Sequence, residues 1–198
     1  MKVKEAKLIT GTMTRTSKMP GLSYSLPAWE CQTGSKLRKV KGTPCFGCYA
    51  LKGNYTRYPA IRRAQYKRLA SLVHDSLVTA MVTQVKRQRW FRWHDAGDVQ
   101  SVEHMNKIME VCRQTPGTSH WLPTQERRYL PSGNTVPNNL VIRLSGSKVR
   151  ESFSNVPWIT NHGTNRPGLG AWRLLLGAWS LPLGAWIAWC LMLGAWGL

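Results

Sequence analysis

Apolar side chains follow two different periods along this chain. Residues 22–26 alternate apolar and polar side chains, which is typical of a half-buried strand. Residues 59–73 instead repeat apolar side chains at three- and four-residue steps, which predicts a helix. A second helix is predicted over residues 76–87, with Asp75 as its N-cap.

The following residues repeat the order strand, loop, helix. Short aromatic or apolar runs at residues 89–94, 120–124 and 140–144 predict three more strands, and a helix capped by Ser101 separates the first two. Strands that alternate with helices along a chain are typical of an α/β fold with a mainly parallel sheet. We therefore expect one α/β domain over residues 21–160.

The two ends of the chain lack these patterns. Residues 1–20 are polar and rich in threonine without a clear period, so we expect an extended basic arm. Residues 161–198 form an apolar, low-complexity tail. Within it the sequence Leu-Gly-Ala-Trp recurs, at residues 169–172, 176–179, 183–186 and 193–196.

The tail has two interpretations. Residues 174–198 carry no charge and are long enough to cross a bilayer, which would make them a tail anchor with the basic remainder inside. However, Pro182 interrupts the run, and its tryptophans are spread along it rather than gathered at two interfaces. Repeats of this kind also arise when a repetitive gene segment is read in the wrong frame. A membrane anchor is therefore the minor alternative.

Positive charge dominates the composition. The 198 residues carry a formal net charge of +19, and residues 1–74 hold fifteen Lys or Arg against Glu5 and Glu30. This excess favours contact of the basic N-terminal half with nucleic acid, although charge alone gives no sequence specificity. No apolar run follows the basic Met1–Glu5 segment, so we expect a cytoplasmic location. In that reducing compartment, cysteines are ligands or buried thiols more often than disulfides.

Three of the five cysteines lie close together in the sequence, as Cys31, Cys45 and Cys48. Pro44 and Gly47 favour a tight turn, on which the C-x-x-C thiolates can face one metal ion or cluster. Three thiolates are one short of a closed tetrahedral site. Either one position stays open for a substrate or cofactor, or a zinc ion takes a fourth ligand such as His94 or His162.

Other polar residues follow the predicted strands directly. His94 ends one predicted strand and Gly97 and Asp98 follow it; Thr124 ends the next strand, and Ser145 follows the last. In parallel α/β sheets, ligands bind at the carboxyl ends of the strands. We therefore expect these residues to share one pocket with the cysteines. Gln125 and Glu126 could equally line this pocket or start a helix.

Several ordered motifs resemble a phage protein family called gene product 88. They cover about residues 18–150: Lys18-Met-Pro-Gly-Leu-Ser-Tyr-Ser-Leu-Pro27, Cys31, Thr43-Pro-Cys-Phe-Gly-Cys-Tyr-Ala-Leu-Lys-Gly-Asn-Tyr55, Phe91-Arg-Trp-His-Asp-Ala-Gly-Asp-Val-Gln-Ser101, His120-Trp-Leu-Pro-Thr124 and Leu140-Val-Ile-Arg-Leu-Ser145. That family in turn resembles radical S-adenosylmethionine proteins, which implies a partial (β/α) barrel.

The resemblance implies a 4Fe–4S cluster held by Cys31, Cys45 and Cys48, with S-adenosylmethionine on the fourth iron. Gly97-Asp98 resembles the turn that binds the methionine amino group, and a carboxylate there suits an ammonium partner. His94, Thr124 and Ser145 would complete the cofactor pocket. The chemistry would be one-electron reductive cleavage that gives a deoxyadenosyl radical.

Two departures from the implied pattern stand out. Thirteen residues separate Cys31 from Cys45, where the radical enzymes usually have three. The Leu-Gly-Ala-Trp repeats also replace a C-terminal cysteine-rich segment of the family. A rival hypothesis is therefore a zinc-stabilised, basic nucleic-acid-binding protein without catalysis, whose aromatic side chains stack bases; the candidates are Tyr55, Tyr58, Tyr66, Trp90 and Trp93.

Overall fold

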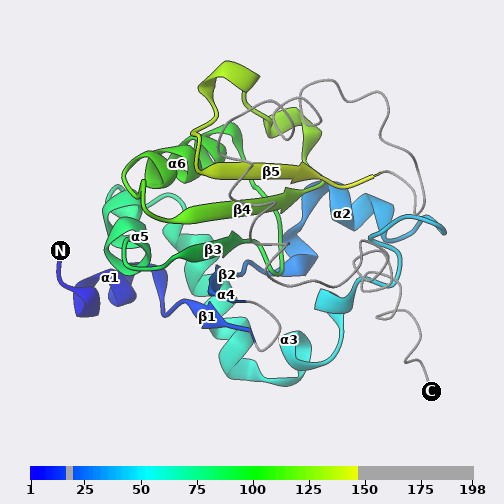
Figure 1. Cartoon of the computed structure of the whole chain (residues 1–198). Helices are drawn as coiled ribbons and strands as arrows, with labels where there is room; N and C mark the ends of the chain where they lie inside the picture. Colours follow the sequence, from blue (N-terminus) through cyan, green and yellow to red (C-terminus); the bar gives the residue numbers. More distant parts are fainter. Residues whose placement is uncertain (17–19, 147–198) are drawn as a thin grey trace. The chain divides into compact units, whose positions relative to one another are not determined.

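A five-stranded sheet organises the residues that the structure describes, 1–16 and 20–146, in a computed structural model of the chain (Figure 1). The strands are neighbours in sequence order: β1 (Thr14–Arg15), β2 (Leu22–Tyr24), β3 (Trp90–Trp93), β4 (Ser119–Thr124) and β5 (Leu140–Leu144). β1 pairs antiparallel with β2, and every other pairing is parallel. The predicted α/β class with a mainly parallel sheet is confirmed. A parallel sheet whose strands follow sequence order also has the arrangement of a partial barrel.

Six α-helices lie in the described residues: α1 (Val3–Thr10), α2 (Gln32–Leu37), α3 (Asn54–Arg57), α4 (Pro59–Ser71), α5 (Leu77–Val85) and α6 (Val102–Arg113). The helices predicted from the apolar periods are α4 and α5. Ser101 caps α6 as expected, because its Oγ accepts a hydrogen bond of 3.0 Å from the His104 N–H. Asp75 is not the N-cap of α5; that position is occupied by Ser76.

Four short 3₁₀ helices complete the described secondary structure: η1 (Ala28–Glu30), η2 (Tyr49–Leu51), η3 (Arg127–Tyr129) and η4 (Gly133–Thr135). η1 and η2 flank the cysteine-bearing stretch, and η3 follows the end of β4. These short helices therefore occupy loops that leave the carboxyl ends of the strands.

Two segments differ from their expected structure. The expected extended arm contains α1, which buries Ala6 and Thr10 and contacts α4 and α5. The expected loop after Cys31 begins with α2. Both helices are short, with eight residues in α1 and six in α2, so tertiary packing decides their conformation.

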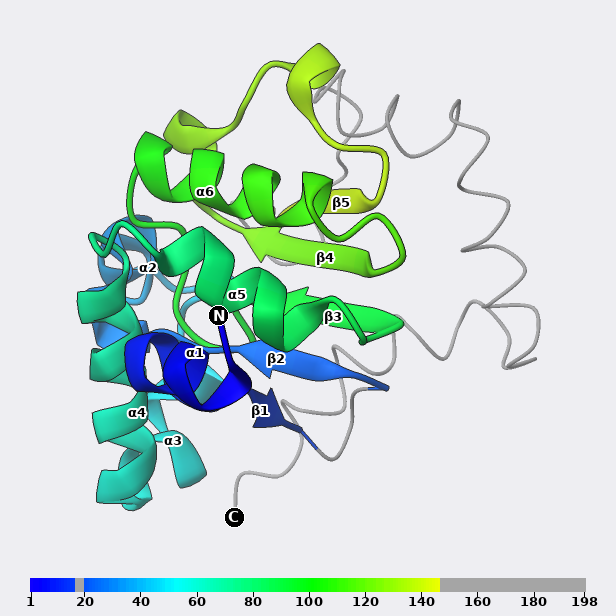
Figure 2. The ribbon, with the colours of Figure 1, turned by 90° about the vertical axis from the view of Figure 1, so that its left-hand side faces the viewer.

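One face of the sheet carries the hydrophobic core. Figure 2 shows α1, α5 and α6 in front of this face. Side chains of alternate strand residues, including Phe91, Trp93 and Leu122, are buried there against Met81 and Ile108 of the helices.

The opposite face of the strands carries the intervening residues, which are only partly buried. Arg92 and Trp121 lie there, and the Arg92 guanidinium stacks 4.7 Å from the centre of the Trp121 ring. Such a pair keeps a cation and an aromatic ring together on this face of the sheet. The two faces of the sheet therefore differ in chemistry: one is apolar and the other is polar and aromatic.

The described helices include none that is both long and apolar enough to span a bilayer. The proposed anchor at residues 174–198 and the Leu-Gly-Ala-Trp repeats lie outside the described residues, so these predictions stay untested.

The turn after β3 packs against the segment after β2. Leu26 donates a backbone hydrogen bond of 2.8 Å to the Ala96 carbonyl. Gly97 has a φ of 79°, and a Cβ added there would lie 2.5 Å from Leu26 Cβ and 2.8 Å from its carbonyl oxygen. Both the backbone conformation and the close approach therefore require glycine.

Replacing Gly97 with alanine should lower the free energy of unfolding by about 3 kcal/mol, because strain at positive φ adds to a backbone clash. Gly42 also has positive φ, at 82°, but nothing lies near its added Cβ. Gly42→Ala should therefore cost only about 1 kcal/mol. Denaturant unfolding of both variants measures the difference, and equal losses would contradict the predicted clash.

Candidate functional site

The structure brings the three cysteines together beyond the carboxyl ends of the strands. Cys31 is the N-cap of α2, and Cys45 and Cys48 follow on the turn that leads into η2. A Cβ added to Gly34 would lie 3.8 Å from Cys31 Sγ and 3.7 Å from Cys45 Sγ. Both sulfur atoms therefore lie within 3.8 Å of one point, although thirteen residues separate the two cysteines.

The three thiols also interact electrostatically with one another. Burial raises the pKa of the Cys31 thiol, and the charges of Asp98, Cys48, Cys45 and Glu126 raise it further. Burial, together with Cys48, also raises the pKa of the Cys45 thiol, to about 11. Both thiols are therefore neutral near pH 7, and their thiolates need a bound cation to become the stable form.

Asp98 lies beside the thiols but is held by its own chain. Its Oδ1 accepts hydrogen bonds from Thr124 Oγ1 at 2.6 Å and from the Val99 N–H at 2.8 Å. Its Oδ2 accepts another, of 2.8 Å, from the Gln125 N–H. Burial raises the pKa of this carboxyl to about 6, and these three hydrogen bonds oppose the rise. Asp98 thus ties the end of β3 to the end of β4.

Glu126 holds the cysteine-bearing segment to the same strand ends. The side chain is fully buried, and its two oxygens accept hydrogen bonds from the Thr33 N–H at 2.6 Å and the Thr33 hydroxyl at 2.7 Å. The exposed Arg128 lies 3.5 Å from one of these oxygens. From the sequence, Glu126 could either line the pocket or start a helix. In the structure its hydrogen bonds to Thr33 hold α2 in place.

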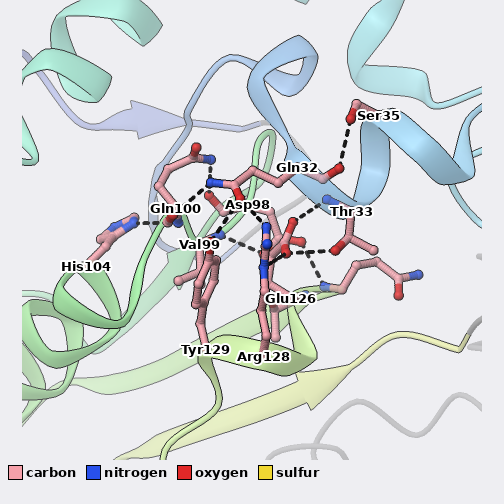
Figure 3. A network of polar contacts seen from close by, with 12 residues as sticks. Gln32, Thr33, Ser35, Asp98, Val99, Gln100, His104, Glu126, Arg128 and Tyr129 are labelled. Carbon is pink, nitrogen blue, oxygen red and sulfur yellow. Dashed lines mark hydrogen bonds and ion pairs between the residues drawn. The ribbon is translucent and has the colours of Figure 1, made fainter.

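Gln32, the residue after Cys31, makes three further contacts, as Figure 3 shows. Its amide nitrogen donates to the Gln100 carbonyl at 2.9 Å, and its amide oxygen accepts hydrogen bonds from Tyr129 at 2.9 Å and from Arg128. Sequence reasoning missed Gln32 and Thr33 as site residues. The only signal for them was their position directly after Cys31.

His94 is placed differently from the prediction. Its ring is buried among Tyr24, Trp93 and His104, on the face of the sheet that the helices cover. Burial, followed by the charges of His104 and Arg92, lowers its pKa well below the usual value. The structure therefore does not bring His94 beside the thiols, where a zinc ligand would have to lie. His162, the other candidate ligand, is outside the described residues.

The remaining predicted residues do meet at the strand ends. Thr124 is buried; its hydroxyl donates to Asp98 and accepts a hydrogen bond of 3.0 Å from the Glu126 N–H. Ser145 is half-buried, and its N–H donates to the Thr124 carbonyl at 2.8 Å. Gly97 lies in the adjoining turn. The structure therefore places four of the predicted residues at one edge of the sheet: Gly97, Asp98, Thr124 and Ser145.

The thiols are neighbours without forming a ready coordination sphere. Among residues 1–16 and 20–146, no group of three or more His, Cys, Asp or Glu side chains is arranged to hold a metal ion. What the geometry defines is an α/β protein with three thiols and two buried carboxyl groups at the carboxyl edge of its sheet.

A comparison with known families identifies the family to which this chain belongs. A family model described as "Gene product 88" matches residues 1–174, and the chain belongs to that phage family. No curated protein and no solved structure matches the chain. The match ends before the last three Leu-Gly-Ala-Trp repeats, which begin at residue 176.

The raised pKa of Asp98 predicts a pH dependence of stability. The folded state binds this proton more tightly than the unfolded chain, whose pKa is near 3.8. The contribution of Asp98 to the free energy of unfolding is therefore fully present below pH 3.8 and is lost as the pH rises through about 6. The loss should approach about 3 kcal/mol.

The measurement is denaturant unfolding of wild type and Asp98→Asn across this pH range. The stability of Asp98→Asn should not change with pH in this range, and the variant should be less stable at low pH, because the amide nitrogen that replaces Oδ2 cannot accept the hydrogen bond from the Gln125 N–H. Asp75→Asn, at an exposed site, should keep the wild-type slope. If the free energy of unfolding of Asp98→Asn still fell with pH as in wild type, a group other than Asp98 would be responsible for the pH dependence.

Proposed function

We propose that Cys31, Cys45 and Cys48 bind an iron–sulfur cluster of the 4Fe–4S type. The observation that carries this proposal is the convergence of the three thiols at the carboxyl edge of the sheet. Thiolates are the usual ligands of such clusters. Three protein ligands leave one iron free for a further ligand.

The surroundings of the thiols suit a cationic cluster core. Asp98, Glu126 and the neighbouring sulfurs all raise the pKa of the Cys31 thiol, so negative charge on this sulfur is unfavourable without a cation. Gly34 leaves room between Cys31 and Cys45, because its missing Cβ would fall 3.0 Å from Cys31 Cβ and close to both sulfurs. The charge around the thiols and the space between them are therefore both suited to an iron–sulfur cluster.

The sheet supports a further part of the proposal, which is binding of S-adenosylmethionine at the same edge. Its four parallel strands follow sequence order, and the cysteine segment leaves the first of them. When bound, the cluster would supply one electron for reductive cleavage of this cofactor. Asp98 and Thr124 keep the Gly97 turn in place, and Glu126 keeps Cys31 over the strand ends.

Anaerobic reconstitution with iron and sulfide tests the cluster. Wild-type protein should gain the broad visible absorbance of sulfur-to-iron charge transfer together with bound iron and sulfide. Cys45→Ala should lose most of both, because two thiolates cannot hold the cluster. Cys112→Ala is the control, since Cys112 is buried on α6 in the core and should not affect loading.

Three results would contradict the proposal. Wild-type protein without bound sulfide, or a Cys45→Ala variant that loads normally, would exclude the cluster. One zinc per chain in protein purified without oxygen would instead favour the rival hypothesis of a zinc-stabilised nucleic-acid-binding protein.

Gly34→Ala tests the space between the sulfurs. The added methyl group crowds Cys31 and Cys45, so cluster affinity should fall by about 10-fold, as for other groups that support metal ligands. Helix propensity favours alanine over glycine, so apo-protein stability should not fall in parallel. Iron retention against a chelator measures the effect. Gly117→Ala, where nothing lies near the added Cβ, should retain iron normally.

A further inference from the structure

The strongly exposed aromatic side chains of the described residues gather in one stretch of the chain. Phe46, Tyr49, Tyr58 and Tyr66 are 49, 53, 49 and 41% exposed, whereas the other strongly exposed large hydrophobic side chains are not aromatic. Exposed apolar rings that gather in one region indicate a surface that a partner covers.

The same stretch is rich in positive charge, and among the described residues no ion pair involves its cations. Residues 29–67 contain nine Lys and Arg and one acidic residue, Glu30. Eight of the nine cations are exposed: Lys36, Lys39, Lys41, Lys52, Arg57, Arg62, Arg63 and Lys67. On α6, in contrast, Glu103 pairs with Lys107 at 2.9 Å and Glu110 with Arg113 at 3.1 Å.

The elements of this stretch are neighbours in space. η1 contacts α2 and η2, η2 contacts α3, and α3 contacts α4. Figures 1 and 2 both show α2 on the side toward which the strand arrows point. The cations and rings therefore belong to one connected group of elements that also carries the three cysteines. We call this surface the basic–aromatic surface and define it as residues 29–67.

We propose that the basic–aromatic surface binds single-stranded nucleic acid. Lysine and arginine side chains neutralise phosphates, and exposed rings stack on bases. A duplex hides the faces of its bases, so exposed rings add affinity only for a single strand. The combination of unpaired cations with exposed aromatic rings therefore fits a single strand better than a duplex.

Two rings of this surface are held in place before any partner binds. The Tyr49 hydroxyl donates to the Asp95 carbonyl, and the Tyr49 ring meets Tyr55 edge-on at 6.0 Å. Trp29 lies beneath the Arg62 guanidinium at 5.1 Å and contacts Tyr66. Rings that are already ordered lose little entropy when a base stacks on them.

The structure changes the set of rings expected to stack bases. Tyr58 and Tyr66 are exposed as the sequence analysis requires, but Trp93 is 2% exposed and packs in the core. Tyr55 is half-buried and donates a hydrogen bond of 2.9 Å to Asp95. Phe46 and Tyr49 are the additional candidates.

A strand on this surface would pass the cysteines, because Phe46 lies between Cys45 and Cys48 and Tyr49 follows directly. Nucleic acid would then be the substrate class of the cluster site. The assignment of nucleic acid as a substrate rests on the proposed function, whereas the binding of nucleic acid to the basic–aromatic surface does not.

Fluorescence anisotropy with a short, labelled, mixed-sequence oligonucleotide tests the charges. The variant Lys36→Gln/Lys39→Gln/Lys41→Gln should bind the single strand more weakly and reduce the slope of log affinity against log salt by about 2. Lys4→Gln/Lys7→Gln/Lys86→Gln removes the same charge at exposed sites outside the surface. This control should keep the wild-type slope to within about 0.5.

The rings are tested in the same assay. Phe46→Ala and Tyr58→Ala should each weaken single-strand binding by at least about fivefold, because each removes a stacking platform. Val73→Ala, at an 81% exposed site, should bind like wild type. Circular dichroism of each variant confirms that the fold is kept.

The proposal is overturned if a duplex of the same sequence binds as tightly as the single strand, or if both lysine variants lose affinity equally. It is also overturned if wild type binds vesicles of anionic lipid but no oligonucleotide. Iron and sulfide content of the same preparations distinguishes the two proposals. If the protein loads a cluster but binds no single-stranded oligonucleotide, only the nucleic-acid proposal is refuted. If it binds the oligonucleotide but loads no cluster, only the iron–sulfur proposal is refuted.

Discussion

Two buried carboxyl groups hold the site together. Asp98 joins the ends of β3 and β4, and Glu126 joins the end of β4 to Thr33 in α2. Without these hydrogen bonds, nothing in the local sequence would keep Cys31 over the strand ends, because α2 has only six residues and buries none of them. The loop between Cys31 and Cys45 closes at a modest entropic cost, because this cost grows only slowly with loop length.

The same two carboxyl groups give the site an excess of negative charge. Asp98 and Glu126 lie near two thiols that are themselves partly buried, so ionisation of Cys31 or Cys45 is opposed by burial and by nearby negative charge. A cation bound between the sulfurs removes this conflict, since it stabilises the thiolates and the carboxylates together. Positive charge lies close by in the sequence, because the exposed lysines Lys39 and Lys41 stand between Cys31 and Cys45.

Particular residues show how far sequence patterns reach. The apolar periods located α4, α5 and α6 and the parallel strands, because a buried face imposes its period on the chain. Position after a strand placed Asp98 and Thr124 at a common edge, because carboxyl ends of parallel strands share one side. The same argument was misleading for His94, because a residue directly after a strand can turn its side chain toward either face of the sheet. The helix α1 was missed because packing against α5, and not its own pattern, stabilises it.

The sequence by itself determined the α/β class, the resemblance to the family, the three candidate thiols and the excess of positive charge, because these follow from local period and residue type. Only the tertiary structure decided which groups meet. It brought Cys31 to Cys45, made Glu126 the anchor of α2, buried His94 on the helix-covered face of the sheet and left Phe46 and Tyr49 exposed. The physical reason is that such contacts depend on the balance of burial and hydrogen bonding among distant segments, which no local pattern records.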